Sequence, residues 1–225
     1  MKLRAVTAIA LLLLGMGFAA PLPQGHGTVD GCAAGNPLIP QAEMFATSNT
    51  VTIADPGDPR LDDRLEPFAS QVYDTVLTNG ARPVGSDVMD GVFWSEDLEQ
   101  MTFESSRQFH LACVDEGELT RIAELVAAQF GQESVLTFTY RSAETSSSDS
   151  FIAEVPGVDV RRFRDAVAAD PDAKSRLGGG SISEDGALVL VAAQADAQLA
   201  KRVVTLSGGD LDMSDVRYGA VSFVS

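Results

Sequence analysis

The stretch that decides the fold is FHLACVDEGELTRIAELVAAQF, residues 109–130. Phe109 and Leu111 alternate with His110, which predicts a strand with one apolar face. Asp115 follows, with a glutamate three residues further on as in a capping box, and apolar residues then recur at helical spacing. The stretch therefore predicts a strand that leads directly into an amphipathic helix.

The same succession of an apolar strand, an aspartate and an amphipathic helix occurs four times. The strands are expected at residues 50–54, 109–113, 151–155 and 188–192. The aspartates are Asp58, Asp115, Asp159 and Asp196. We interpret them as N-caps, because an aspartate side chain can accept from the free N–H groups of a first helical turn. Catalytic aspartates would not be expected at every helix start.

Further strands, expected at 100–104, 135–140, 181–183 and 217–224, complete two similar units. Residues 151–225 follow the order strand–helix–strand–strand–helix–strand, and residues 49–141 follow it too if residues 82–95 are an insertion. The serine-rich residues 142–150 are typical of a linker. We predict an α+β protein of two tandem ferredoxin-like (βαββαβ) sandwiches. A single mixed sheet with helices on one face is the alternative.

The beginning of the chain has the features of a secretory signal peptide. Lys2 and Arg4 precede an apolar run over residues 5–15, and small residues follow, with Ala19 at a suitable cleavage point. We expect residues 1–19 to be removed and the product to be secreted or periplasmic. An uncleaved membrane anchor is the alternative, although the apolar run is shorter than the roughly 20 residues that span a bilayer.

Residues 20–48 are rich in proline and glycine and lack periodicity, which predicts an extended arm. Cys32 lies in this arm and Cys113 in the middle of the chain. In an oxidising compartment we expect them to form a disulfide. The alternative is one buried and one exposed thiol.

The composition narrows the classes of partner. The 16 basic and 32 acidic residues give a net charge of −16, which disfavours nucleic acid and anionic lipid as partners. A hydrophobic content of 45% is typical of a globular protein with a core. We expect no stable membrane insertion after signal removal.

His110 is the candidate acid or base, with Glu104 or Arg107 expected near it. The chain contains no G-x-S-x-G nucleophile motif and no spacing typical of a zinc site. The acidic run of residues 55–63 suggests calcium, but its spacing departs from an EF-hand and fits a helix cap and first turn. The glycine run at 178–180 precedes a strand and predicts a turn.

Two further pairs of residues are candidates for binding. Phe93 and Trp94, in the expected insertion, would form an exposed recognition patch. Arg161 and Arg164 lie on one flank of an expected helix, where they would pair with acidic neighbours or contact an acidic partner.

One segment resembles a known family. The sequence FGQESVL, residues 130–136, follows a helix and opens a strand. It is similar to the end of an uncharacterised family of small exported bacterial α+β proteins, over about residues 108–140. The resemblance implies an exported α+β domain and no particular activity.

The sequence thus leaves three hypotheses for function. The first is a non-enzymatic exported protein that binds a protein or envelope component through a sheet face or residues 82–95. The second is an extracellular hydrolase that uses His110 with a neighbouring carboxylate. The third is a calcium-stabilised module.

Overall fold

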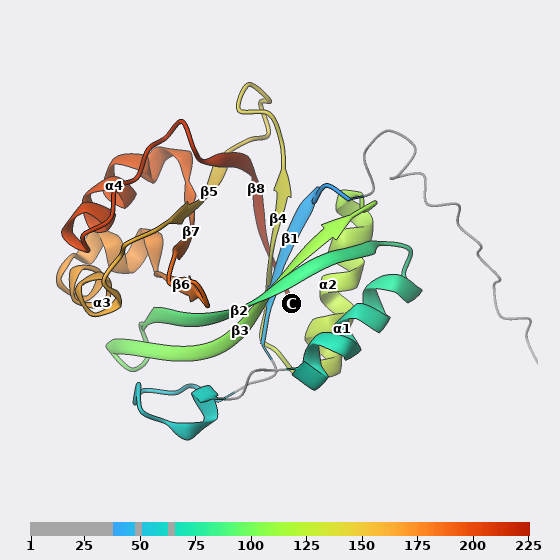
Figure 1. Cartoon of the computed structure of the whole chain (residues 1–225), viewed down its shortest axis with the longest axis horizontal. Coiled ribbons are helices and arrows are strands. Elements are labelled where there is room, and N and C mark those ends of the chain that lie inside the picture. The colour runs from blue at the N-terminus through green and yellow to red at the C-terminus, as the bar shows by residue number, and fades with distance from the viewer. Residues whose placement is uncertain (1–37, 48–50, 63–65) are drawn as a thin grey trace, which may run out of the picture.

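In the described part of the chain, eight strands form a closed antiparallel barrel with four α-helices on its outside (Figure 1). The computed structural model describes residues 38–47, 51–62 and 66–225. The strands are β1 (Ala42–Ala46), β2 (Arg82–Ser95), β3 (Gln100–Ala112), β4 (Val135–Tyr140), β5 (Ser150–Val155), β6 (Gly179–Ser183), β7 (Leu188–Ala193) and β8 (Arg217–Val224). The helices are α1 (Glu66–Thr78), α2 (Glu116–Phe130), α3 (Val160–Ala169) and α4 (Ala197–Leu206), with short turns η2 (Pro59–Asp62), η3 (Ala173–Leu177) and η4 (Gln194–Asp196).

Each half of the chain has the order β-α-β-β-α-β, but the halves do not form separate sheets. The strands lie in the order β4-β1-β3-β2 in the first half and β6-β7-β5-β8 in the second. Hydrogen bonds from β2 to β6 and from β4 to β8 close them into one ring. Two tandem ferredoxin-like sandwiches and the single mixed sheet with helices on one face are therefore both wrong. Each half would leave two strand edges unpaired, and the barrel satisfies these edges with the other half.

The first strand lies earlier than expected. β1 occupies Ala42–Ala46, within the predicted arm of residues 20–48. The strand expected at 50–54 is reduced to an isolated bridge between Ile53 and Phe103. The alternation of β1 is hidden in the sequence because Glu43, a charged residue, is as buried as the apolar residues beside it.

Residues 82–95 are not an insertion. They form β2, which pairs with β3 from Arg82 opposite Ala112 to Ser95 opposite Gln100. The separate strands expected at 100–104 and 109–113 form one continuous strand, β3, which ends at Ala112, one residue before Cys113. The expected linker contains the exposed loop that joins β4 to β5, so it connects two halves of one barrel.

Apolar side chains form three cores, one inside the barrel and two outside it. Helices α1 and α2 pack on one side, over Met44, Phe109 and Leu111. Helices α3 and α4 pack on the opposite side (Figure 1), over core residues that include Phe151 and Leu190. The interior core is contributed by both halves and contains Met89, Phe138, Ile152 and Val189.

Two of the expected N-caps are confirmed. The Asp115 carboxylate accepts from the backbone N–H of Glu118 at 2.8 Å, and the Glu118 carboxylate accepts from the backbone N–H of Asp115. This is a complete capping box at the start of α2. Asp159 likewise accepts from the backbone N–H of Arg162 at the start of α3.

The other two aspartates have different roles. Asp58 accepts from the backbone N–H of Arg60 at 2.9 Å and pairs with the Arg60 guanidinium, so it caps the short turn η2, whereas α1 begins only at Glu66. Asp196 makes no side-chain bond to the first turn of α4 and instead pairs with Arg176. The N-cap interpretation therefore fails for Asp196, whereas Asp58 is an N-cap, but of the short turn η2 and not of α1.

Asp115→Ala is expected to lower the free energy of unfolding by about 1 kcal/mol, because it removes the acceptor of the capping box. Urea denaturation followed by circular dichroism measures the change. Glu144→Ala, in the exposed loop after β4, is the matched control and should leave stability within about 0.5 kcal/mol of the parent. Equal effects of both variants would contradict the assigned cap.

Cys113 is buried and is not a free thiol. Cys32 lies outside the described residues, so the Cys32–Cys113 disulfide stays a prediction. The signal peptide of residues 1–19 also lies outside them. Among the helices of the described residues, none is both long and apolar enough to cross a membrane.

Candidate functional site

One end of the barrel carries a hydrogen-bonded group of polar side chains, which we name the His110 cluster. Its members are Glu43, Asp87, His110, Tyr140 and Arg217. Glu43 is fully buried and lies directly opposite His110 in the pairing of β1 with β3. His110 Nδ1 lies 2.6 Å from Glu43 Oε2, and His110 Nε2 lies 2.7 Å from Asp87 Oδ2. Tyr140 donates its hydroxyl to Glu43 Oε1.

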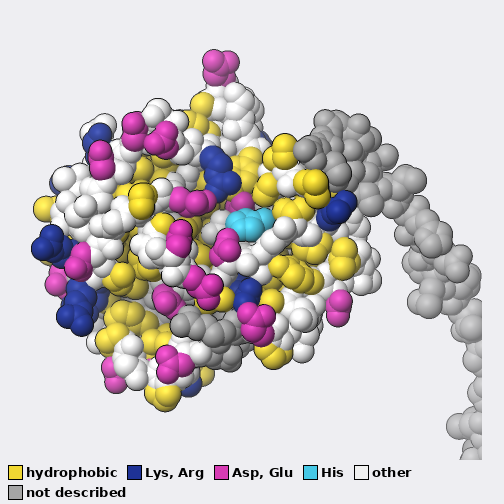
Figure 2. Space-filling model, in the orientation of Figure 1, with side chains coloured by type: hydrophobic (Ala, Val, Ile, Leu, Met, Phe, Trp, Pro, Cys, Tyr) yellow, Lys and Arg dark blue, Asp and Glu magenta, His cyan; other side chains and the backbone are white. Residues whose placement is uncertain are grey.

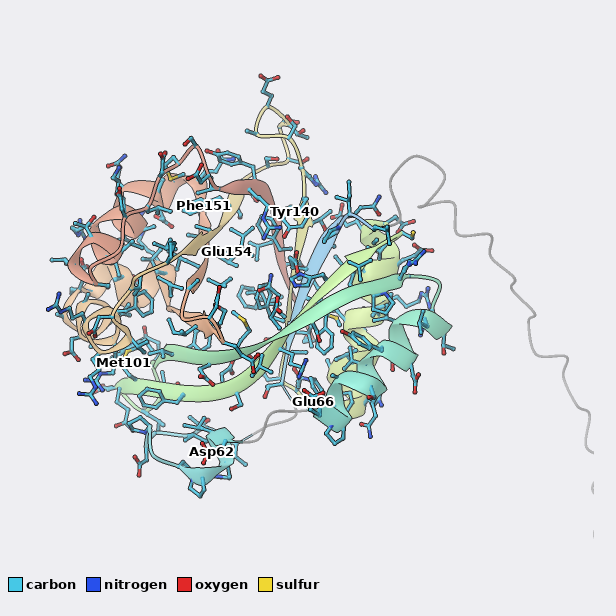
Figure 3. The ribbon with its side chains drawn as sticks, in the orientation of Figure 1. Asp62, Glu66, Met101, Tyr140, Phe151 and Glu154 are labelled. Carbon is cyan, nitrogen blue, oxygen red and sulfur yellow. The ribbon has the colours of Figure 1, made fainter. Side chains whose placement is uncertain are left out.

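Arg217 completes the cluster at the rim. Its Nη2 donates to Glu154 Oε1 at 2.7 Å, and its guanidinium lies 4.6 Å from the centre of the Tyr140 ring. Figure 3 shows Tyr140 and Glu154 at this end of the barrel. Figure 2 shows a histidine at the middle of the visible face with acidic side chains beside it.

The cluster keeps His110 protonated. The hydrogen bond to Glu43 raises the pKa of His110 to about 9, although burial acts in the opposite direction. Burial and the charge of Glu43 raise the pKa of the Tyr140 hydroxyl. At neutral pH both ring N–H groups of His110 are thus donated to carboxylates, and the ring has no lone pair to accept a proton. His110 is therefore better suited to closing this end of the barrel through ion pairs than to acting as a general base.

The residues expected beside His110 lie elsewhere. Arg107 is on the outer face of β3, where it donates to Glu66 of α1 at 2.7 Å. Glu104 shares the inward-facing row of β3 with His110 but is six residues away, which is about 20 Å along a strand. The sequence placed His110 on the opposite face of its strand from Phe109 and Leu111, and in the structure that face is the barrel interior; it did not indicate the partners, because those come from β1 and β2.

The other end of the barrel contains an open pocket of about 500 Å³, which we name the lumen pocket. Every one of the eight strands contributes to its lining, so the pocket is the interior of the barrel itself. Most of the lining is apolar and comes from Phe45, Phe93, Leu136, Val189, Val191, Val221 and Phe223. Phe223 is 69% exposed, which places an aromatic ring at the mouth.

Glu104 is the acidic residue of the lumen pocket. Burial raises the pKa of its carboxyl group to about 7, opposed by a hydrogen bond with Ser106. Arg176 is the basic residue of the lining, and its guanidinium is engaged by Asp196. Glu104 itself makes no ion pair with any described residue.

Two glycines shape this end of the barrel. A Cβ atom at Gly91, which lies opposite Glu104 on β2, would come within 2.5 Å of Glu104 Cγ and of the Phe93 ring. A Cβ atom at Gly179 would lie 2.1 Å from the carbonyl oxygen of Val92, so β6 could not approach β2. Only Gly178 of the expected turn precedes the strand, whereas Gly179 and Gly180 belong to β6, where Gly179 permits barrel closure.

The expected aromatic patch is divided between two sides of β2. Phe93 is half-buried and lines the lumen pocket, whereas Trp94 packs against the core under α3 and α4. The ammonium group of Lys174 lies 4.1 Å from the centre of the Trp94 ring. The two side chains therefore do not form one recognition surface.

The expected arginine pair lies outside the lumen pocket. Arg161 is exposed on α3, and Arg164 forms an ion pair with its neighbour Asp165 at 2.8 Å. Asp170, the acidic residue that follows α3, pairs with Arg202 of α4. The first ion pair lies within α3, and the second connects the end of α3 to α4.

The acidic run expected as a calcium site is only partly described. Asp58 Oδ2 lies 2.6 Å from Arg60 Nη2, so its carboxylate is already paired. Asp63 lies outside the described residues. Within the described ranges, no group of three or more His, Cys, Asp and Glu residues could hold a metal ion.

Sequence reasoning missed Glu43 as a site residue. The signal was a single charged residue inside the short run AEMFA, residues 42–46, between proline-rich stretches. An isolated charge in such a run indicates burial only if the run is known to be a strand.

Comparisons with protein-family models, curated proteins and solved structures found no match. The resemblance of residues 130–136 therefore stays a prediction.

Proposed function

We propose that this chain is an exported, non-enzymatic protein that binds a small, largely apolar molecule in the lumen pocket. The observation that carries the proposal is the pocket itself, an open cavity of about 500 Å³ lined by all eight strands. Its size and lining match those of small-molecule sites, which are mostly apolar with a few placed polar groups and are common in the mouths of barrels.

The chemistry of the barrel ends favours binding over hydrolysis. His110, the candidate base, has both ring nitrogens engaged by carboxylates and lies at the end opposite the lumen pocket. A hydrolase that used His110 would need a free lone pair on its imidazole beside a bound substrate. The described lining of the lumen pocket offers Glu104 and several serines, and His110 is not part of it.

The fold also leaves a different surface open to a partner than residues 82–95, which the sequence suggested. Residues 82–95 are a strand of the barrel, and the outer face of the barrel is covered by helices on two sides. The interior is thus the sheet face that is left open for a ligand. Export is supported by the signal-like residues 1–19 and by a buried Cys113 that is not a free thiol.

Val191→Trp is expected to weaken binding at least tenfold, because a larger ring at this position of β7 fills the lumen pocket. The probe is Nile red, a neutral apolar dye, and the readout is its saturable fluorescence increase with the intact protein.

Leu77→Trp is the matched control, since Leu77 is exposed on α1 and is not part of the lining. The control should bind like the parent. Near-ultraviolet circular dichroism checks that both variants keep their packing. Equal dye binding by parent and Val191→Trp would contradict the proposal.

A further inference from the structure

The position of Glu104 suggests which ligands the lumen pocket selects, an inference that rests on the proposed binding function. Glu104 reaches into the pocket from β3, and Gly91 leaves the space that its carboxylate occupies. Because Gly91 has no side chain, there is also room for the Phe93 ring. The Glu104 carboxylate and the Phe93 ring therefore lie side by side on the wall of the lumen pocket.

Among the described lining residues, the charge of Glu104 has no counter-charge that is not already paired. Arg176 is held by Asp196, and the remaining lining residues are neutral. No ion pair connects Glu104 to another described residue, and its hydroxyl neighbour Ser106 supplies a neutral hydrogen bond. A half-buried carboxylate in this setting is costly to ionise, and a cation brought by the ligand would offset that cost.

We infer that the lumen pocket binds amphiphilic amines, with the ammonium group on Glu104 and the apolar body among the side chains of the lumen. The ammonium would donate charge-assisted hydrogen bonds to the carboxylate and contact the face of Phe93. The apolar tail would lie against Leu136, Val189 and Val191 of the lining. A carboxylate ligand would be repelled by ionised Glu104, and a neutral alcohol would leave its charge unpaired.

The affinity of the lumen pocket for an amine should depend on pH. The pKa of the free Glu104 carboxyl is about 7, so the group is mostly protonated at pH 6 and mostly ionised at pH 8. Alkylamines stay protonated across this range, as lysine does. Amine binding should therefore strengthen from pH 6 to pH 8 and should release a proton near neutral pH.

The experiment compares octylamine, octanol and octanoate by isothermal titration calorimetry on the full protein. At pH 8 and about 0.15 M salt, octylamine is expected to bind at least tenfold more tightly than octanol, as one charge-assisted hydrogen bond can supply. Octanoate should bind most weakly. In Glu104→Gln the preference for the amine should fall to less than about twofold, while octanol binding is retained.

Glu144→Gln is the matched control, because it removes the same charge from the exposed loop after β4. It should keep the amine preference, which separates local recognition from the general attraction of an acidic protein for cations. Equal binding of octylamine and octanol, or tighter binding of octanoate, would overturn the inference and leave the binding function standing. If none of the three probes bound, both would be overturned.

Discussion

Glu43→Gln is expected to lower the free energy of unfolding by roughly 3 kcal/mol at pH 6. Glu43 is fully buried and holds both His110 and Tyr140 by hydrogen bonds. Its loss leaves the His110 cation without the partner that contributes most to the rise of its pKa from 6.5 to about 9. A shift of this size corresponds to about 3 kcal/mol, and breaking a buried ion pair costs a similar amount.

The sign of the pH dependence follows from the raised pKa of His110. A group whose pKa is higher in the folded state stabilises fully below its unfolded pKa, here about 6.5. That contribution is lost as the pH rises through about 9. The difference in unfolding free energy between parent and Glu43→Gln should therefore be largest below pH 6.5 and should narrow above pH 9, as measured by urea denaturation across the range.

Asp87→Asn is the matched control within the same cluster. Asp87 also bonds His110, at 2.7 Å, but its side chain is 60% exposed. An exposed ion pair contributes at most about 1 kcal/mol, so this variant should be much the milder one. A larger loss in Asp87→Asn than in Glu43→Gln would contradict the assigned role of burial.

Local elements were predictable from the sequence where a single face is buried. In α2, the helical spacing of Leu119, Ile122 and Val126 matches their burial against the barrel. On β3, Phe109 and Leu111 pack in the core under α1 and α2, whereas His110 between them faces the barrel interior. This agrees with their alternation in the sequence. In both cases the buried and polar positions alternate with the period of the element, which is the signal that sequence reading uses.

The barrel and its pocket were not predictable by the same reasoning. Pairing of β2 with β6 joins Gly91 to Ser181, 90 residues apart, and no local pattern reports such a contact. β1 was missed because its inward face carries Glu43, whose burial depends on partners from β3 and β4. Glu104 was recognised as a polar residue near His110 in sequence, but its pocket exists only once all eight strands are closed.

Cleavage of the loop between β4 and β5 is expected to leave the two halves of the chain associated. A protease site inserted in residues 142–149 would cut a largely exposed segment that belongs to no strand of the barrel. The cut protein should elute as one particle on gel filtration and unfold in one transition. The two halves remain joined by the β2–β6 and β4–β8 pairings and by the interior core.

The separated halves should behave differently from independent domains. The first half alone would expose the edges of β2 and β4, and the second half the edges of β6 and β8. Each would also lose residues that the other supplies, such as Val224 of β8 in the core under α1 and α2. Unpaired edges and exposed apolar surface favour self-association, so each half refolded alone should aggregate or form oligomers. Mixing the two during refolding should restore the single particle, whereas two monomeric halves with their own cooperative transitions would contradict the closed barrel.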